Sequence, residues 1–157
     1  MQNNENIYQV FIASSLRLQL HRDAAEKAIK EVNDMQEVKD LHVHFNVFRY
    51  ENRPTELQKV EKRDAQEKCD AALRQSTIFF LIIDDVIRSL TQYEFEMALK
   101  HLDRGELPQE IHIFYDESKN VESTAEGMSY DDFKKKENLI FSLVGVGILI
   151  FAIFIDK

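Results

Sequence analysis

Four residue types are rare in or absent from this sequence. Its 157 residues include one Cys, two Pro, four Gly and no Trp. The single thiol, Cys69, excludes both a disulfide framework and a zinc site built from clustered cysteines. The hydrophobic share of 44% and the eleven Phe exclude a disordered chain. Because the length leaves room for one ordinary domain, we expect a single globular unit.

Basic residues are also fewer than acidic residues. The chain carries 20 Lys and Arg against 28 Asp and Glu, which gives a formal net charge of -8. This balance argues against a protein whose main partner is a nucleic acid. The polar residues 1–6 lack the basic start and the apolar centre of a secretory signal, so we expect a cytoplasmic domain.

Two phosphate-binding motifs and a metal-ligand pattern are missing as well. The sequence contains neither GxGxxG nor GxxxxGK followed by Ser or Thr, so it predicts neither a Rossmann dinucleotide cradle nor a P-loop. The five His share no metal-ligand spacing. The adjacent Asp84 and Asp85 are typical of a helix cap or a solvated loop. We therefore expect no metal ion and no bound cofactor.

What the chain does contain is an alternation of strand and helix patterns. Short segments rich in β-branched and aromatic residues predict four strands, over 8–13, 41–48, 78–83 and 111–115. Apolar residues at steps of three and four predict three helices, over 16–32, 56–74 and 91–102. The third strand, IFFLII, is apolar at every position, which is typical of a central strand covered on both faces. The alternation predicts an α/β fold with a central parallel sheet.

In an open parallel sheet the ligand binds beyond the carboxyl ends of the strands. By this rule, the polar residues that directly follow each predicted strand are the candidates for ligand binding. They are Ser14 and Ser15, the loop 49–54, Asp84 with Asp85, and Asp116.

Glu94, in the helix after the central strand, has two interpretations. Met97 and Ala98 follow it at three and four residues, so it borders the apolar stripe of the helix without an obvious cation. A partly desolvated carboxylate at the rim of a cleft stabilises positive charge on a sugar ring or accepts a proton. Alternatively, Thr91 and Glu94 form a capping box, in which the glutamate only satisfies a backbone donor. Spacing alone favours the cap.

Several segments, taken in order, resemble the TIR-like domains of bacteria. The opening YQVFIASSLRL resembles the first motif of that family. IFFLII followed by LTQYEFEMALKHLDRG is similar to its third strand and to the helix with its catalytic glutamate. The resemblance covers about residues 7–116 and implies a flavodoxin-like, three-layer α/β/α fold. In that family the glutamate precedes an alanine by four positions, which corresponds to Glu94 before Ala98 and implies that Glu94 is catalytic.

The resemblance also implies an activity and a substrate. Known enzymes of the family cleave the bond between nicotinamide and ribose, so this chain would be an NAD glycohydrolase or an ADP-ribosyl cyclase with NAD as substrate and no cofactor. It implies that Ser14 and Ser15 touch the ligand and that Arg49 or Arg53 meets its pyrophosphate. Tyr93 would stack on the ligand. Self-association and a role in signalling or bacterial antiphage defence are implied in the same way.

Two departures from the family pattern keep other classes open. Leu90 stands where some members carry an aromatic residue, and a fifth strand and a final helix are not evident after residue 116. One alternative is a catalytically silent TIR module that only assembles with its partners. Another is a nucleoside 2-deoxyribosyltransferase, which shares a flavodoxin-like sheet and a glutamate-bearing helix.

The last part of the chain divides into a polar and an apolar segment. Residues 117–138 predict a polar linker, and residues 139–155 form a run without charges. As a helix this run would be about 25 Å long, near the lower limit for crossing a hydrocarbon core of about 30 Å. Lys134 to Lys136 before the run favour a cytoplasmic domain anchored in the inner membrane. The alternative is a buried strand or helix of the fold, because Gly145 and Gly147 interrupt the helical pattern.

Overall fold

The computed structural model of the chain describes residues 5–49, 62–116, 127–133, 135 and 148–153. Arg53, most of the predicted linker and most of the C-terminal apolar run lie outside these residues.

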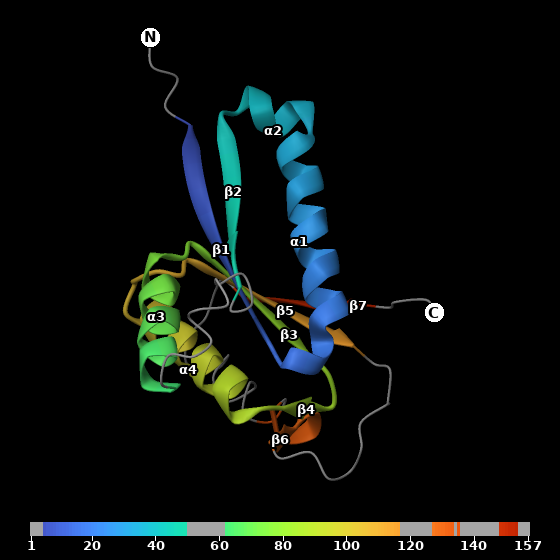
Figure 1. Cartoon of the computed structure of the whole chain (residues 1–157), viewed down its shortest axis with the longest axis vertical. Coiled ribbons are helices and arrows are strands. Elements are labelled where there is room, and N and C mark those ends of the chain that lie inside the picture. Colours follow the sequence, from blue (N-terminus) through green and yellow to red (C-terminus); the bar gives the residue numbers. More distant parts are fainter. Residues whose placement is uncertain (1–4, 50–61, 117–126, 134, 136–147, 154–157) are drawn as a thin grey trace.

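Strands and helices alternate along the chain as the sequence predicts (Figure 1). The strands are β1 (Asn6–Ser14), β2 (Val43–Phe48), β3 (Ile78–Ile83), β4 (Val86–Ile87), β5 (Glu110–Asp116), β6 (Met128–Ser129) and β7 (Ile148–Ile153). The helices are the 3-10 turn η1 (Leu16–Leu18), α1 (Gln19–Asp34), α2 (Gln36–Asp40), α3 (Lys62–Gln75) and α4 (Ser89–Asp103). All four predicted strands and all three predicted helices are among them.

Five strands form one sheet in the order β2-β1-β3-β5-β7, and every neighbouring pair is parallel. The short strands β4 and β6 form a separate antiparallel pair. From β1 the chain adds β2 on one side, and from β3 it adds β5 and β7 on the other. The winding direction therefore reverses between β1 and β3. A reversal of this kind is a topological switch point, where open α/β sheets bind their ligands.

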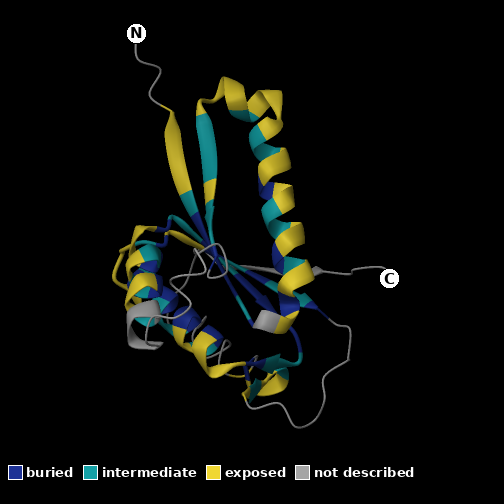
Figure 2. Cartoon of the chain, in the orientation of Figure 1, coloured by how far each residue is buried: buried dark blue, intermediate teal, exposed yellow. Residues whose placement is uncertain are grey.

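The two faces of the sheet are covered by different helices (Figure 1). Helix α1 packs on one face, where Ile29 contacts the layer formed by Val10 and Ile12 of β1. Helices α3 and α4 pack on the other face, over Phe11 and Ala13 of the same strand. Successive side chains alternate between the faces because a strand has a period of two. The buried residues therefore concentrate where the strands lie between these helices, as Figure 2 shows, and the fold is compatible with the predicted three layers.

Helix α1 begins later than predicted and buries a different face. Residues 16–18 form the η1 turn, so the α-helix starts at Gln19. Leu20, which stands four residues after Leu16 on the apolar pattern that predicts this helix, is 81% exposed. Ile29, on the same pattern, is buried as expected, and Arg22, which is not on it, is buried as well. The buried face therefore differs in part from the predicted one, and an arginine side chain lies inside the fold.

The prediction of a polar linker is wrong for the described residues 127–133. Strand β6 pairs with β4, and Phe133 is 1% exposed, with its ring centroid 5.2 Å from that of Phe95 in α4. Gly127 has a φ of +152°, and a Cβ at this residue would lie 2.8 Å from Cγ1 of Val86. The segment approaches β4 this closely because residue 127 has no side chain. Residues 127–133 are thus part of the domain.

The described part of the C-terminal apolar run is a strand. Ile148–Ile153 form β7, which pairs in parallel with β5 from Ile111 to Asp116. These six residues agree with the alternative to a membrane-spanning helix, in which the run supplies the missing strand of the fold. Among the residues that the structure describes, no helix combines the length and the apolar character needed to cross a bilayer.

Replacing Phe133 with Ala tests whether residues 127–133 belong to the core. Truncation of a buried phenylalanine leaves a cavity, so we expect the free energy of unfolding to fall by about 3–4 kcal/mol. Leu20→Ala changes an exposed position and is expected to alter it by less than about 0.5 kcal/mol. Urea denaturation followed by circular dichroism measures both variants. Equally small effects would mean that the segment is a linker after all.

Candidate functional site

Polar side chains gather at the carboxyl edge of the parallel sheet. Because β1, β3 and β5 run in the same direction, Ser14, Asp84 and Asp116 end or directly follow neighbouring strands at one edge. Helices α1 and α4 follow β1 and β3 respectively, so both begin at this edge. The switch point between β1 and β3 lies here, at the edge for which the sequence predicts a ligand.

An arginine from α1 holds the turn after β1. Arg22 Nη1 donates a hydrogen bond to Ser14 Oγ at 2.8 Å and another to the carbonyl oxygen of Ser15. The Arg22 side chain is buried, and these bonds offset the cost of removing its charge from water. Ser15 Oγ is also buried, and it has no hydrogen-bond partner among the described residues. Since an unsatisfied buried hydroxyl is costly, Ser15 is a candidate for contact with a ligand.

A short ion pair joins this turn to the end of β3. Arg17 Nη2 lies 2.5 Å from Oδ2 of Asp84, whose side chain is 7% exposed. Oδ1 of Asp84 accepts a hydrogen bond from the backbone N–H of Val86 at 3.2 Å. The sequence predicts a helix cap or a solvated loop for Asp84. In the structure it is the anion of a partly buried pair at the switch point.

A second pair connects α1 with the end of β5. His21 Nε2 lies 2.9 Å from Oδ2 of Asp116, and both side chains are largely buried. Arg17, His21 and Arg22 were not singled out from the sequence, because charged residues near the start of a helix are usually solvated. One signal was available. Arg22 precedes Ile29 by seven residues, so both lie on the same face of α1.

Arg49, at the end of β2, is buried and bound to α1. Its Nη1 lies 2.6 Å from Oδ1 of Asp23 and 2.9 Å from Oε2 of Glu26. Hydrogen bonds from Lys30 and also from Arg49 hold the pKa of Glu26 below its ordinary value of 4.5, although burial opposes this shift. Arg49 therefore ties β2 to α1, a structural role that differs from the predicted contact with a pyrophosphate. Arg53, the other predicted pyrophosphate residue, lies outside the described residues.

The capping interpretation of Glu94 is wrong. Helix α4 begins at Ser89 with Arg88 as its N-cap, and no side chain caps it. Thr91 and Glu94 therefore stand three and six residues after the N-cap, beyond the positions of a capping box. Glu94 is 7% exposed. The structure thus places a buried carboxylate in the N-terminal half of a helix that packs against β1, β3 and β5.

Tyr93, the residue before Glu94, lies on the outer side of α4 against α3. Its hydroxyl donates a hydrogen bond to Oδ2 of Asp70 at 3.2 Å, and its side chain is exposed. Partial burial of the hydroxyl, and then the negative charge of Asp70, raise the pKa of Tyr93 above its ordinary value of 10.0. Adjacent residues of a helix point about 100° apart. This arrangement gives Tyr93 a contact with α3, and its stacking on a ligand stays a prediction.

The chemistry of the carboxyl edge comes from carboxylates, guanidinium groups, hydroxyls and an imidazole. Among the described residues, no group of three or more His, Cys, Asp and Glu is arranged to hold a metal ion. Arg17 of η1 and His21 of α1 contact the carboxylates at the ends of β3 and β5. Such an arrangement is suited to orienting a polar ligand and to stabilising charge on it.

Comparison with known proteins adds no family assignment. No protein-family model matches the chain, and no curated protein matches it. Any functional proposal therefore depends on the residues and contacts of this chain.

The contact between Glu26 and Arg49 predicts a pH-dependent stability. A carboxyl group whose pKa is lowered by folding stabilises the protein above its unfolded pKa, and this contribution is lost as the pH falls through the folded value. We expect Glu26→Gln to lower the free energy of unfolding by about 1–2 kcal/mol near neutral pH. Below pH 4.5, the ordinary value for Glu26, the difference from the wild type should shrink.

Urea denaturation of both proteins between about pH 7 and pH 3 measures this difference. Glu31→Gln is the matched control, because among the described residues Glu31 pairs only with Lys27, in an exposed contact on the same helix. It should change stability by less than about 0.5 kcal/mol at every pH. A Glu26→Gln deficit that is the same at every pH would contradict the prediction.

The pair of Arg17 and Asp84 predicts coupled effects on stability. Arg17→Gln leaves the Asp84 carboxylate without its cation, so we expect a loss of about 2 kcal/mol, less than for a fully buried pair because Arg17 is partly exposed. The double variant Arg17→Gln/Asp84→Asn removes the unpaired charge and should recover at least half of that loss. Thermal and urea unfolding of the two single variants and the double variant measures the coupling. Strictly additive losses would show that the two side chains do not interact.

Proposed function

We propose that this chain is a TIR-like domain that cleaves NAD at the bond between nicotinamide and ribose, with Glu94 as the catalytic residue. The observation that carries the proposal is the burial of the Glu94 carboxylate in the N-terminal half of α4, where it does not cap the helix. A glutamate at this place is what the resemblance of LTQYEFEMALKHLDRG to the family's catalytic helix implies.

The order of the strands supports the fold part of the proposal. Numbered within the main sheet alone, the strands follow the order 2-1-3-4-5. This is the order of flavodoxin-like, doubly wound sheets. Strand β7 also supplies a fifth parallel strand, which was not evident from the sequence.

The proposed reaction needs a carboxylate that stabilises positive charge, and it needs no general acid to protonate the leaving group. The nicotinamide ring of NAD is a cationic pyridinium, so it leaves as a neutral molecule when its bond to C1′ of the ribose breaks. Positive charge then develops on the ribose ring, and the Glu94 carboxylate stabilises it. Water adds to C1′ and releases a proton, which yields ADP-ribose and nicotinamide. Attack on C1′ by an atom of the substrate itself yields a cyclised product instead.

The burial of Glu94 fits this role. A charge acts more strongly in a site with a low dielectric constant than in water. The same carboxylate in an exposed position would be screened by solvent. This is why we assign the role to Glu94 and not to Glu96, which is less buried.

For substrate binding we propose the turn after β1 and the loop after β2. Ser15 contributes a buried hydroxyl, and Ser14 is oriented by its bond to Arg22. Because Arg49 binds the carboxylates of α1, Arg53 is our candidate for the pyrophosphate of NAD. We further propose that the domains self-associate, as the resemblance implies, so that activity rises with protein concentration.

Glu94→Gln is the decisive variant, because it keeps the size of the side chain and removes its charge. The full chain is incubated with NAD at high protein concentration, and the release of nicotinamide is followed by chromatography. We expect the wild type to release nicotinamide and Glu94→Gln to lower the rate by about 100-fold or more. Glu96→Gln, which changes the neighbouring glutamate on the same helix, should retain wild-type activity.

The outcomes separate the proposed function from its alternatives. Wild-type rates for a folded Glu94→Gln variant would contradict the catalytic assignment. Intact NAD together with concentration-dependent assembly of the wild type would favour a non-catalytic TIR module. Turnover of deoxynucleosides with NAD untouched would identify a nucleoside 2-deoxyribosyltransferase.

A further inference from the structure

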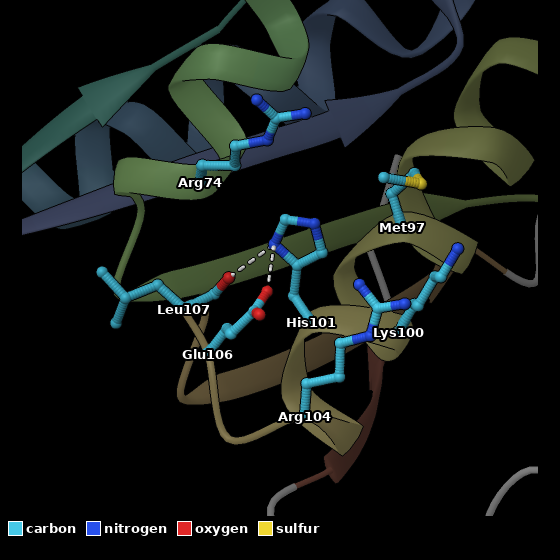
Figure 3. Close-up of a pocket in the computed structure, with 7 residues that line it drawn as sticks. All are labelled: Arg74, Met97, Lys100, His101, Arg104, Glu106 and Leu107. Carbon is cyan, nitrogen blue, oxygen red and sulfur yellow. Dashed lines mark hydrogen bonds and ion pairs between the residues drawn. The ribbon is translucent and has the colours of Figure 1, made fainter.

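A cavity opens between the C-terminal ends of α3 and α4 (Figure 3). Helix α4 follows β3 and leads back to the start of β5, so its last turn lies at the amino edge of the sheet. The cavity is therefore at the opposite edge from the switch point. Its volume of about 390 Å³ is within the range of small-molecule sites.

Basic side chains from both helices line this cavity. Arg74 comes from the last turn of α3, and Lys100 and Arg104 come from the end of α4. All three are exposed, and none of them forms an ion pair with a carboxylate of the described residues. Glu106 also lines the cavity, but its carboxylate is 3.8 Å from Nδ1 of His101. In a chain with a net charge of -8, this is a local excess of positive charge.

The cavity wall after α4 is held by backbone hydrogen bonds. Gly105 has a φ of +70° and donates its N–H to the carbonyl of Leu102 at 3.0 Å. The N–H of Glu106 donates to the carbonyl of His101 at 2.9 Å. Together these bonds form a Schellman motif, which satisfies the last carbonyl groups of a helix. Lys100 and Arg104 are therefore not needed as partners for those two carbonyls.

His101 forms the inner part of the cavity. Its side chain is buried, and Nδ1 lies 3.1 Å from the carbonyl oxygen of Leu107. Because a carbonyl oxygen only accepts hydrogen bonds, Nδ1 is the donor. Figure 3 shows the second ring nitrogen, Nε2, on the opposite side of the ring, toward the space between Arg74 and α4. The imidazole thus adds a polar group to the basic lining.

We propose that this cavity binds the phosphate group of a small phosphorylated molecule. Guanidinium groups match the geometry of phosphate oxygens, and Lys100 adds a point charge to the cavity lining. Met97 and Leu107 supply apolar surface for the remainder of the molecule. Basic residues also complement the dipole at a helix C-terminus. That effect alone does not require basic residues of two helices to line the same cavity.

This site is separate from the proposed NAD-cleaving site and does not depend on it. Glu94 lies in the N-terminal half of α4, whereas Lys100, His101 and Arg104 lie at its other end. The test therefore measures binding directly and uses no enzymatic readout.

Inorganic pyrophosphate is the probe, titrated into the full chain in about 150 mM NaCl to screen weak surface binding. Calorimetry and backbone amide shifts follow its binding. We expect amide shifts at the ends of α3 and α4 in the wild type, and at least about tenfold weaker binding there in the double variant Arg74→Gln/Arg104→Gln, because charge-assisted hydrogen bonds are lost. Both arginines are exposed, so the double variant keeps its core.

The control variant Lys27→Gln/Lys39→Gln removes the same total charge from exposed positions outside the cavity. It should bind pyrophosphate like the wild type. Glu106→Gln removes the carboxylate from the lining and should tighten binding. Absence of binding by the wild type, or equal weakening in both double variants, would overturn the proposal, as would weaker binding by Glu106→Gln.

Discussion

The whole arrangement depends on the burial of β3 on both faces. This strand has no polar side chain, and Phe79, Leu81 and Ile82 are almost fully removed from water. Such a strand is stable only between two layers of helices, with α1 on one face and α3 and α4 on the other. Covering both faces requires each connection to cross the sheet as a helix and return in parallel. Parallel strands then place their carboxyl ends, and the starts of the following helices, at the same edge.

The polar site follows from this packing. At the carboxyl edge the strands leave the apolar layer. The partly buried charged residues at this edge are stabilised by ion pairs and hydrogen bonds. Arg17 of η1 and His21 in the first turn of α1 contact carboxylates at the ends of β3 and β5. Glu94 comes from α4, which lies on the other face of the sheet. Basic side chains and the Glu94 carboxylate therefore come from elements on opposite faces of the sheet.

The sequence predicted the features that depend on hydrophobic periodicity and missed those that depend on tertiary contacts. The four strands and three helices follow from the apolar pattern, and so does the central position of β3. The buried position of Arg22 does not, because its bonds to the turn after β1 exist only once α1 is docked. Thr91 has the spacing of a cap, yet α4 starts earlier at Ser89. Phe133 belongs to a segment whose average composition is polar, so composition alone did not predict that its side chain lies in the core.

Gly127 has a consequence for how the chain tolerates change over evolution. Any side chain at this position would meet Val86 and the backbone of Ile87, so replacing it separates β6 from β4. Phe133 enters the core six residues later. A pattern of a glycine followed six residues later by a large apolar residue, downstream of an unbroken apolar strand, therefore describes a physical requirement of this fold.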